Sequence, residues 1–458
     1  MGKYFGTDGF RGRVNVDLTS MHAYRVGRFL GTYFARQKKN TDEQRARIVI
    51  GKDTRRSSYM LEYSVAAGIA ASGADACLLH VTTTPSVAYV TKTENFDCGI
   101  MISASHNPFW DNGIKLLNRF GEKMEDSVIA EIEEYLDLAG EEKEDYAVDE
   151  KIGRITDLVQ GRNRYTGYLI SLGKYSFKGI KIALDCANGS GYFIAPSVFS
   201  AMGARVFVIN DSPNGTNINK DCGSTHIEAL AKYVRENNLD VGFAYDGDAD
   251  RCLCVDENGN ILTGDHILYI CALHLKKQGL LAQNKIVATV MSNIGLDLSL
   301  APHGITVEKT KVGDRFVYEH MNKSGIELGG EQSGHVIFSK YATTGDGILT
   351  SLMLMEAMID SDKRLSELHK EFSFFPQHTV NIRVRDKNVA VNDPEIKELV
   401  GELCQRLEGR GRVLVRASGT EPVVRVMAEA PSSEICENYC MRVARHLTEK
   451  GFAENVNK

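Results

Sequence analysis

Three stretches of the chain repeat one order of segments: a short apolar run, a helical stretch, a glycine and a second apolar run. The copies span residues 48–81, 182–209 and 286–307. Nearly continuous apolar strands joined through a helix are typical of βαβ units, whose sheets are covered by helices on both faces. The pattern predicts three similar α/β domains with mixed sheets.

The pattern changes near the C-terminus. Val380–Val384 alternates apolar and polar residues as a half-exposed strand does, and Asp393 followed by Pro394 marks the start of a helix. Two further strands, Val413–Val415 and Val423–Val426, precede a closing helix. The order strand, helix, strand, strand, helix predicts a C-terminal α+β domain with an antiparallel sheet.

These patterns predict four domains around a central cleft. The acidic tract Glu141–Asp145 is expected to be a solvated linker, and Phe374–Pro376 is expected to open the C-terminal domain. The expected limits are 1–150, 151–250, 251–373 and 374–458.

Composition restricts the class of protein. The 54 Lys and Arg residues against 60 Asp and Glu residues leave a net charge of −6, which argues against a nucleic-acid partner. Ten singly spaced cysteines indicate reduced thiols. No apolar run approaches the roughly 18 residues that span a bilayer, and the first residues lack the apolar core of a secretory signal. We therefore expect a cytoplasmic protein with no membrane partner; a homodimer remains open.

Asp246, Asp248 and Asp250 stand two residues apart directly after an apolar strand. Carboxylates at this spacing can converge on one hard cation such as Mg²⁺. An EF-hand is a poor alternative, because Arg251 occupies the position where that loop requires glycine and the flanking segments resemble strands. A solvated acidic turn is the simpler alternative for this segment taken alone.

Ser105 lies in the stretch Ser103–Pro108, which follows an apolar run. A serine at such a strand end can act as a nucleophile or carry a phosphoryl group, although most serines in this setting are turn residues that bond their own backbone. A phosphoserine oxygen could complete the cation site. Arg11 could clamp the same phosphate, and His106 could orient it or be structural. Lys115 is a candidate proton carrier, provided that burial beside cations lowers its pKa.

Two further segments combine groups that bind sugars and phosphates. Gly329–His335 places hydroxyl-recognising side chains between glycines, which suits a sugar-binding loop or a flexible turn equally well. Arg416, Ser418, Gly419, Thr420 and Arg425 offer the backbone N–H groups, hydroxyls and guanidinium groups that hold a dianionic phosphate.

Along essentially its whole length the chain resembles the α-D-phosphohexomutase family. Four motifs occur in the order that the family has: Ser103–Pro108, Asp246–Arg251, Gly330–His335, and Arg416–Pro422 with Arg425–Met427.

The resemblance implies that Ser105 is a phosphoserine required for activity, and that it binds one Mg²⁺ together with the three aspartates. Lys115 is implied as the leading acid/base, with Arg11 and His106 beside the reacting phosphate. The implied substrate contacts are Arg251, Asp314, Glu331, Ser333, His335, Arg416, Ser418, Gly419, Thr420 and Arg425. Lys52 stands where an arginine is more usual, and Asp314 stands where related branches carry a histidine, so a second acid/base is not identified.

Gln332 and Lys311–Arg315 resemble the branch of the family that acts on glucosamine phosphates, with a hexosamine phosphate as the small-molecule partner. The implied reaction interconverts glucosamine 6-phosphate and glucosamine 1-phosphate through a 1,6-bisphosphate, feeding UDP-N-acetylglucosamine synthesis. Three alternatives remain: a mutase of mannose or glucose phosphates, a catalytically silent phosphosugar-binding protein, and a metal-dependent phosphatase.

Overall fold

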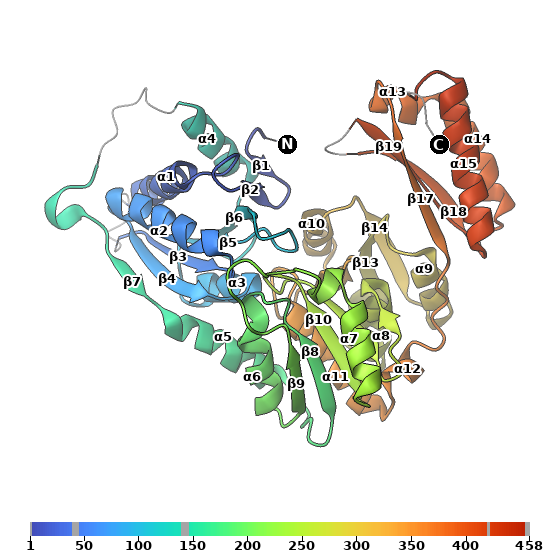
Figure 1. Ribbon diagram of the computed structural model, residues 1–458, viewed down its shortest axis with the longest axis horizontal. Coiled ribbons are helices and arrows are strands. Elements are labelled where there is room, and N and C mark those ends of the chain that lie inside the picture. The colour runs from blue at the N-terminus through green and yellow to red at the C-terminus, as the bar shows by residue number, and fades with distance from the viewer. Residues whose placement is uncertain (1, 39–44, 139–145, 419–421, 454–458) are drawn as a thin grey trace. The chain divides into compact units, whose positions relative to one another are not determined.

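The computed structural model describes residues 2–38, 45–138, 146–418 and 422–453, which form four sheets and their helices (Figure 1). The expected linker Glu141–Asp145 lies outside the described residues. The chain divides into two compact units. Met1–Met291 with Glu308–Lys370 make the first unit, and Ser292–Val307 with Glu371–Lys458 make the second.

The first sheet has seven strands in the order β1-β2-β6-β5-β3-β4-β7. They are β1 (Phe5–Gly6), β2 (Gly9–Arg13), β3 (Arg47–Lys52), β4 (Asp75–Val81), β5 (Cys98–Ile102), β6 (Asp111–Asn118) and β7 (Ile155–Asp157). Its helices are α1 (Ser20–Lys38), α2 (Arg56–Ala71), α3 (Thr84–Thr93) and α4 (Asp126–Asp137). β3 pairs in parallel with β4 and β5, whereas β6 is antiparallel to β2 and β5, so the sheet is mixed.

Alternate side chains of β3 are covered by different helices. Ile48 and Ile50 belong to a hydrophobic cluster with residues of α1 and α2, whereas Val49 belongs to a second cluster with residues of α3. Because successive side chains of a strand point to opposite faces, a strand that is apolar at every position needs cover on both sides. This explains the apolar run that predicted the first βαβ unit, and Figure 1 shows helices on both faces of this sheet.

The second sheet has the order β12-β11-β10-β8-β9. Its strands are β8 (Lys181–Asp185), β9 (Arg205–Ile209), β10 (Val241–Tyr245), β11 (Cys252–Asp256) and β12 (Ile261–Leu262), with helices α5 (Val159–Leu172), α6 (Ile194–Ala201) and α7 (Glu228–Glu236). The same alternation recurs here: the ring of Phe243 stacks on Phe199 of α6, whereas Ala244 packs with Leu230 and Val234 of α7.

β10 and β11 form an antiparallel hairpin of this one sheet. The expected domain limit at residue 250 therefore falls inside the sheet, because sequence reasoning took the aspartate loop as the end of a domain. A limit after β12 fits the pairing better. The expected limit at residue 150 also separates β7 from β4, its partner in the first sheet, whereas the limit at residue 373 remains a prediction.

The third sheet has the order β14-β13-β15-β16 and is also mixed. Its strands are β13 (Lys285–Thr289), β14 (Thr306–Thr310), β15 (Leu328–Gly330) and β16 (Val336–Phe338), and its region contains helices α8 (Gly264–Lys277), α9 (Ile294–Leu300), α10 (Asp314–Ser324), α11 (Gly347–Ser361) and α12 (Leu365–Leu368). Val317 and Met321 of α10 pack on Val287 of β13 and Ile337 of β16. The elements β13, α9 and β14 are the strand, helix and strand that the third repeat predicted, so that prediction is confirmed.

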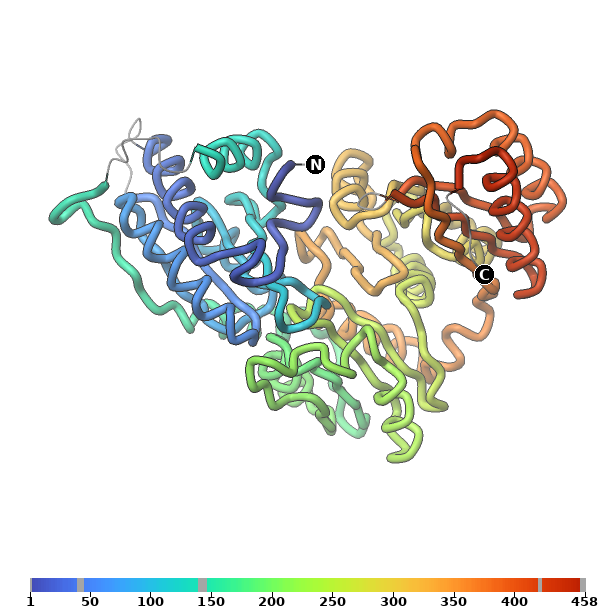
Figure 2. The backbone as a smooth tube through the Cα atoms, turned by 45° about the horizontal axis from the view of Figure 1, so that its top comes forward, coloured from blue at the N-terminus to red at the C-terminus, as the bar shows by residue number. Residues whose placement is uncertain are grey.

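The fourth sheet is antiparallel, in the order β17-β19-β18. Its strands are β17 (Gln377–Arg383), β18 (Arg412–Ala417) and β19 (Val423–Glu429), with helices α13 (Lys387–Asn392), α14 (Pro394–Arg406) and α15 (Ser433–Glu449). The carboxylate of Asp393 accepts hydrogen bonds from the backbone N–H groups of Glu395 and Ile396, as a helix cap does. Figure 2 shows the two longer helices together, and their apolar residues share one core with the sheet. The predicted α+β domain is confirmed.

Five 3₁₀ helices complete the described secondary structure: Asp149–Lys151, Ser190–Tyr192, Gly223–Thr225, Ala282–Asn284 and Ala301–His303. Among the described helices, none has the length and apolar character needed to cross a membrane.

Two glycines let α1 and α2 approach each other closely. A Cβ atom at Gly68 would lie 2.0 Å from the carbonyl oxygen of Tyr24, and one at Gly27 would lie 2.2 Å from that of Val65. Backbone oxygens cannot move aside as the end of a side chain can, so these positions require glycine.

We expect Gly68→Ala to lower the free energy of unfolding by about 1–3 kcal/mol, because the two helices must separate to admit the methyl group. Gly167→Ala in α5 is the matched control, since no atom lies within 4 Å of its Cβ position. The first thermal transition of each variant is the measurement. The prediction would be wrong if Gly68→Ala melted at or above the temperature of Gly167→Ala.

Candidate active site

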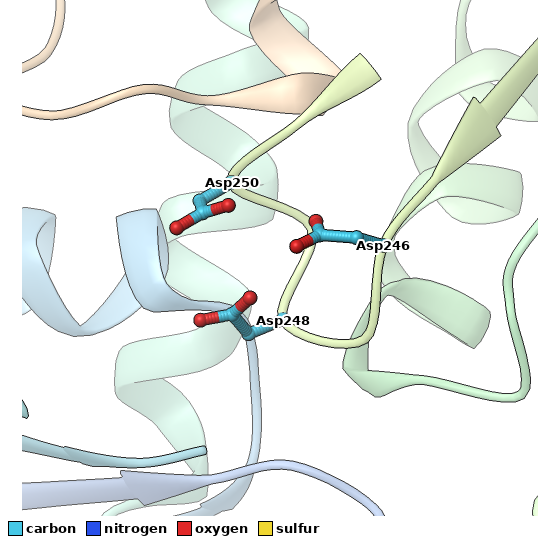
Figure 3. A group of neighbouring side chains, drawn as sticks. All are labelled: Asp246, Asp248 and Asp250. Carbon is cyan, nitrogen blue, oxygen red and sulfur yellow. The ribbon is translucent and has the colours of Figure 1, made fainter. Parts of the chain in front are cut away.

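The turn between β10 and β11 brings three carboxylates together. One oxygen each from Asp246, Asp248 and Asp250 lies within 4.8 Å of the others, and all three residues are buried (Figure 3). Burial raises the pKa of Asp246 well above its usual value, and the charges of Asp250 and Asp248 raise it further. Three buried carboxylates cannot all stay ionised without a positive partner. The flanking strands also exclude the EF-hand alternative.

Two oxygens of this aspartate group are open to a further ligand. Among the described residues, neither Oδ1 of Asp248 nor Oδ1 of Asp250 has a hydrogen-bond partner, although both are buried. Buried polar atoms are normally bonded, so this pair calls for a ligand. Clustered carboxylate oxygens are the donor set that Mg²⁺ prefers. The residues therefore fit the expected metal.

Lys115 of β6 contacts the aspartate group directly. Its Nζ donates to Oδ2 of Asp248 at 2.8 Å and to Oδ2 of Asp250 at 3.2 Å, and it lies 3.3 Å from Oδ2 of Asp8. Although burial opposes the charged form, these carboxylates raise the pKa of Lys115 well above its usual value. The expectation that cations lower this pKa was wrong, because the neighbours are acids. Lys115 keeps its proton.

Ser105 lies against the same aspartates. Its Oγ donates to Oδ2 of Asp246 at 2.5 Å and lies 3.3 Å from Nδ1 of His106. It follows β5, which pairs with β6, the strand of Lys115. The sequence separates Ser105 from Asp246 by 141 positions, and the fold brings them into contact as predicted.

Guanidinium charges act on His106, the residue that follows Ser105. Burial lowers the pKa of His106 to about 4, and the charges of Arg251 and Arg11 lower it further. Among the described residues, the buried Nε atoms of Arg11 and Arg251 have no hydrogen-bond partner. An Nη atom of Arg11 lies 3.5 Å from the side-chain oxygen of Asn107, in the Ser105 loop. Unpaired guanidinium N–H groups beside a serine suit a phosphoryl group.

A cavity of about 1160 Å³ opens beside the aspartates within the first unit. Its lining includes Asp8, Lys115, Asp250, Asp314 and His335. The cavity gives a small molecule access to the lysine and to one edge of the aspartate group.

Asp314 and His335 face each other at this cavity. Nε2 of His335 lies 3.7 Å from Oδ2 of Asp314 and accepts from the backbone N–H of Gly345 at 3.0 Å. Its Nδ1 lies 3.8 Å from Oδ1 of Asp250. A ring that accepts at Nε2 carries its proton on Nδ1, so that N–H is directed at the aspartate group.

The expected sugar loop is the turn between β15 and β16. Oε1 of Glu331 accepts from the backbone N–H of Gly313 at 3.0 Å, and the Ser333 hydroxyl lies 3.5 Å from Oε2 of Glu331. The turn thus stands beside the start of α10, which carries Asp314. The structure brings the three loop residues Glu331, Ser333 and His335 into the region of Asp314.

The expected phosphate-binding residues belong to the second unit. Arg416 of β18 lies directly opposite Arg425 of β19. Partial burial lowers the pKa of Arg416, and the charge of Arg425 adds to this effect. The backbone oxygen of Ser418 accepts from Nζ of Lys387 at 2.6 Å. Gly419 and Thr420 lie outside the described residues, so their role stays a prediction.

Sequence reasoning missed several residues that contact this site. The Thr84 hydroxyl donates to Oδ2 of Asp248 at 2.5 Å. Nζ of Lys123 donates to Oδ1 of Asp314 at 2.8 Å and to Oδ1 of Asp8 at 3.1 Å. Asp8 lies three positions before Arg11 in the glycine-rich stretch Gly6–Gly12, and this proximity was the one available signal. Arg55 and Asn219 bond the backbone of the Ser105 loop.

Comparison with known proteins agrees with this arrangement along the whole chain. The family models of phosphoglucomutase/phosphomannomutase match in order: α/β/α domain I over residues 2–143, domain II over 163–259, domain III over 263–374, and the C-terminal domain over 380–446.

Two relatives are similar over nearly their full length. A phosphoglucosamine mutase of Lachnospira eligens is 61% identical over 99% of this chain and 100% of its own. That of Lachnoclostridium phytofermentans is 56% identical over 98% of this chain and 99% of its own. A crystal structure of a phosphoglucomutase/phosphomannomutase family protein from Burkholderia thailandensis shares the fold, with a TM-score of 0.80 at 21% identity over 99% of both chains. The chain therefore belongs to the α-D-phosphohexomutase family, that of the phosphoglucomutases and phosphomannomutases.

Proposed function

We propose that this protein is an isomerase that interconverts glucosamine 6-phosphate and glucosamine 1-phosphate by way of a phosphorylated Ser105. The observation that carries the proposal is the contact of the Ser105 Oγ with Asp246, beside three converging carboxylates. The sugar is proposed from the name that the full-length relatives bear.

The reaction consists of two transfers in opposite directions. In the first, the bond between Ser105 Oγ and phosphorus breaks, a bond from phosphorus to O1 of the sugar forms, and the O1 proton passes to the Ser105 Oγ. The 1,6-bisphosphate then turns over. In the second transfer the bond between O6 and phosphorus breaks, the bond from phosphorus to Ser105 Oγ forms again, and the Ser105 hydroxyl proton passes to O6.

The residues divide this work by charge. Arg11 and Arg251 face the phosphoryl group on Ser105, and His106 stays neutral beside it. A Mg²⁺ held by Asp246, Asp248, Asp250 and a phosphoserine oxygen would offset charge on the transferring group. Lys115 holds a proton at Nζ and is the acid; His335, at the same cavity, is the second proton carrier that the sequence left open.

The substrate itself is held by two further groups of residues. Glu331, Ser333 and Asp314 are proposed to bind sugar hydroxyl or amino groups. Arg416, Ser418 and Arg425 are proposed to bind the phosphate that does not react, because two guanidinium groups on directly paired positions can both donate to one phosphate.

We expect Ser105→Ala to lower kcat by a factor on the order of 10⁴ or more, since the group that accepts phosphate is lost. Ser64→Ala in α2 is the control, because the Ser64 hydroxyl bonds only the carbonyl of Met60 among the bonds described. Both variants should keep the melting temperature of the parent. Full turnover by Ser105→Ala would exclude the mechanism.

The intact mass of the parent protein, incubated with a hexose bisphosphate, should show one added phosphoryl group. The absence of this group would favour a silent binding protein.

The choice of sugar is tested by comparing kcat/KM for glucosamine, glucose and mannose 6-phosphates in one coupled assay. We expect the value for glucosamine 6-phosphate to exceed the other two by about tenfold or more, because acidic groups at the cavity favour an amino group over a hydroxyl. A higher value for glucose or mannose 6-phosphate would assign the protein to a sister branch.

Mg²⁺ should raise the melting temperature of the parent protein, because it binds the aspartate group of the folded protein and offsets the repulsion among the three carboxylates. Asp248→Asn should weaken Mg²⁺ binding by about tenfold or more, as measured by calorimetric titration. Asp256→Asn is the matched control: it changes a buried aspartate of β11 outside the group and should leave the Mg²⁺ affinity unchanged. Equal affinities of the two variants would contradict the assignment of the site.

A further inference from the structure

The loop that carries Ser105 turns two backbone carbonyl groups toward side chains from other parts of the first unit. The Ser105 oxygen accepts from Nη2 of Arg55 at 3.1 Å and from Nδ2 of Asn219 at 2.8 Å. The Asn107 oxygen accepts from the same two atoms, at 2.5 Å and 3.1 Å. One guanidinium and one amide therefore each bridge both carbonyls.

Arg55 is itself held in place on the side away from the loop. Its side chain is fully buried and forms an ion pair with Asp53, whose Oδ1 accepts from the Ser58 hydroxyl at 2.7 Å. Asp53 in turn donates its backbone N–H to the oxygen of Ile102, the last residue of β5, at 3.0 Å. The guanidinium thus ties the Ser105 loop to the ends of two neighbouring strands, β3 and β5.

Asn219 approaches the loop from the other direction, out of the segment between β9 and α7. Its backbone N–H donates to the oxygen of Ala187 at 2.9 Å, which anchors it to the second sheet. Gly247, between Asp246 and Asp248, also lies against the loop: a Cβ there would come within 2.6 Å of the Ser105 oxygen. Asn219 therefore joins the serine loop to the part of the fold that carries the aspartates.

The backbone of Ser105 needs such external bonds. Its φ of 50° is left-handed, a conformation that is unfavourable for serine. Within the loop, the backbone N–H of Ser105 donates to the Ser103 hydroxyl at 2.9 Å. The carbonyl side is bonded by Arg55 and Asn219, so these two side chains set the direction in which the Oγ points.

We propose that Arg55 and Asn219 are positioning residues, which hold the Ser105 hydroxyl in line with Asp246 for phosphoryl transfer; this rests on the proposed function of Ser105. Asn219 bonds backbone atoms of the loop, whereas Arg55 also donates to the Ser103 hydroxyl at 3.5 Å; none of these bonds uses the reacting Oγ of Ser105. Their loss should slow the transfer to and from Ser105 and leave substrate binding nearly intact.

The test uses Asn219→Ala and Arg55→Lys, each with a matched control. Asn188→Ala is the control for Asn219→Ala, because the two asparagines have similar backbones and similar burial. Both are left-handed, with φ of 48° for Asn188 and 57° for Asn219, and their exposed fractions are 8% and 7%. The Asn188 amide bonds the Asn217 oxygen at 3.4 Å, within its own domain. Arg28→Lys is the control for the second, since Arg28 is buried and bonds the Ala71 oxygen at 3.3 Å, away from the loop.

We expect both test variants to lower kcat by roughly ten- to a hundredfold while KM changes by less than about twofold, the pattern of a displaced reacting group. The controls should keep the kcat of the parent even where their melting temperatures fall as far as those of the test variants. Equal kcat in a test variant and its control, or a loss confined to KM, would overturn the proposal.

A second pair of measurements separates this proposal from the proposed function. The rate at which glucose 1,6-bisphosphate phosphorylates Ser105, followed by intact mass, should fall in the test variants alone, whichever hexose phosphate is the substrate. Amide hydrogen exchange of residues 103–108 should quicken in the same two variants. If the parent protein takes up no phosphoryl group, the proposed function fails; if exchange in this segment is unchanged, the positioning role fails by itself.

Discussion

Repulsion among three buried aspartates is the constraint that the rest of the site depends on. Their oxygens lie within 4.8 Å of one another, and two like charges 4 Å apart repel by about 4 kcal/mol at the effective dielectric typical of proteins. Lys115, Thr84 and Ser105 each bring a hydrogen-bond donor to these oxygens. All three belong to the first sheet or its helices, whereas the aspartates belong to the second. The cluster is therefore tolerable only when both sheets are in place.

Two arginines, Arg11 and Arg251, supply positive charge near His106, the neighbour of Ser105. Burial lowers the pKa of His106 to about 4, and the charges of Arg251 and Arg11 lower it further. The buried Nε atoms of these two arginines have no hydrogen-bond partner among the described residues. A carboxylate thus contacts the Ser105 hydroxyl, and a guanidinium group contacts the same loop at Asn107. A phosphoryl group needs both, since its oxygens bind cations of the protein and share a metal with the acids. The arrangement favours phosphoryl transfer over simple binding of a sugar.

An alternating chain of charges connects this centre to the substrate side. Asp8 pairs with Lys115 and with Lys123, and Lys123 pairs with Asp314 at the start of α10. Each charged group has neighbours of opposite sign, so the buried charges stabilise one another in a way that isolated ones could not. The same contacts hold α10 against the β6–α4 segment. The proposed sugar contacts are therefore placed by the same ion pairs that place Lys115.

The amino-acid sequence by itself determined the elements and the main participants. Apolar runs joined through helical stretches predicted the three βαβ units. Alternating apolar and polar residues, followed by an Asp-Pro helix start, predicted the C-terminal domain. Both signals can be read because they are local in the sequence. Ser105 and the three aspartates were also predicted, since each motif is contiguous. Tertiary structure alone decided the partners of Lys115, the contacts of Thr84 and Lys123, and the bonds from Arg55 and Asn219 to the serine loop. The sign of a pKa shift and the direction of a hydroxyl depend on groups that lie 50 or more positions away along the chain, and only folding brings those groups within a few ångströms.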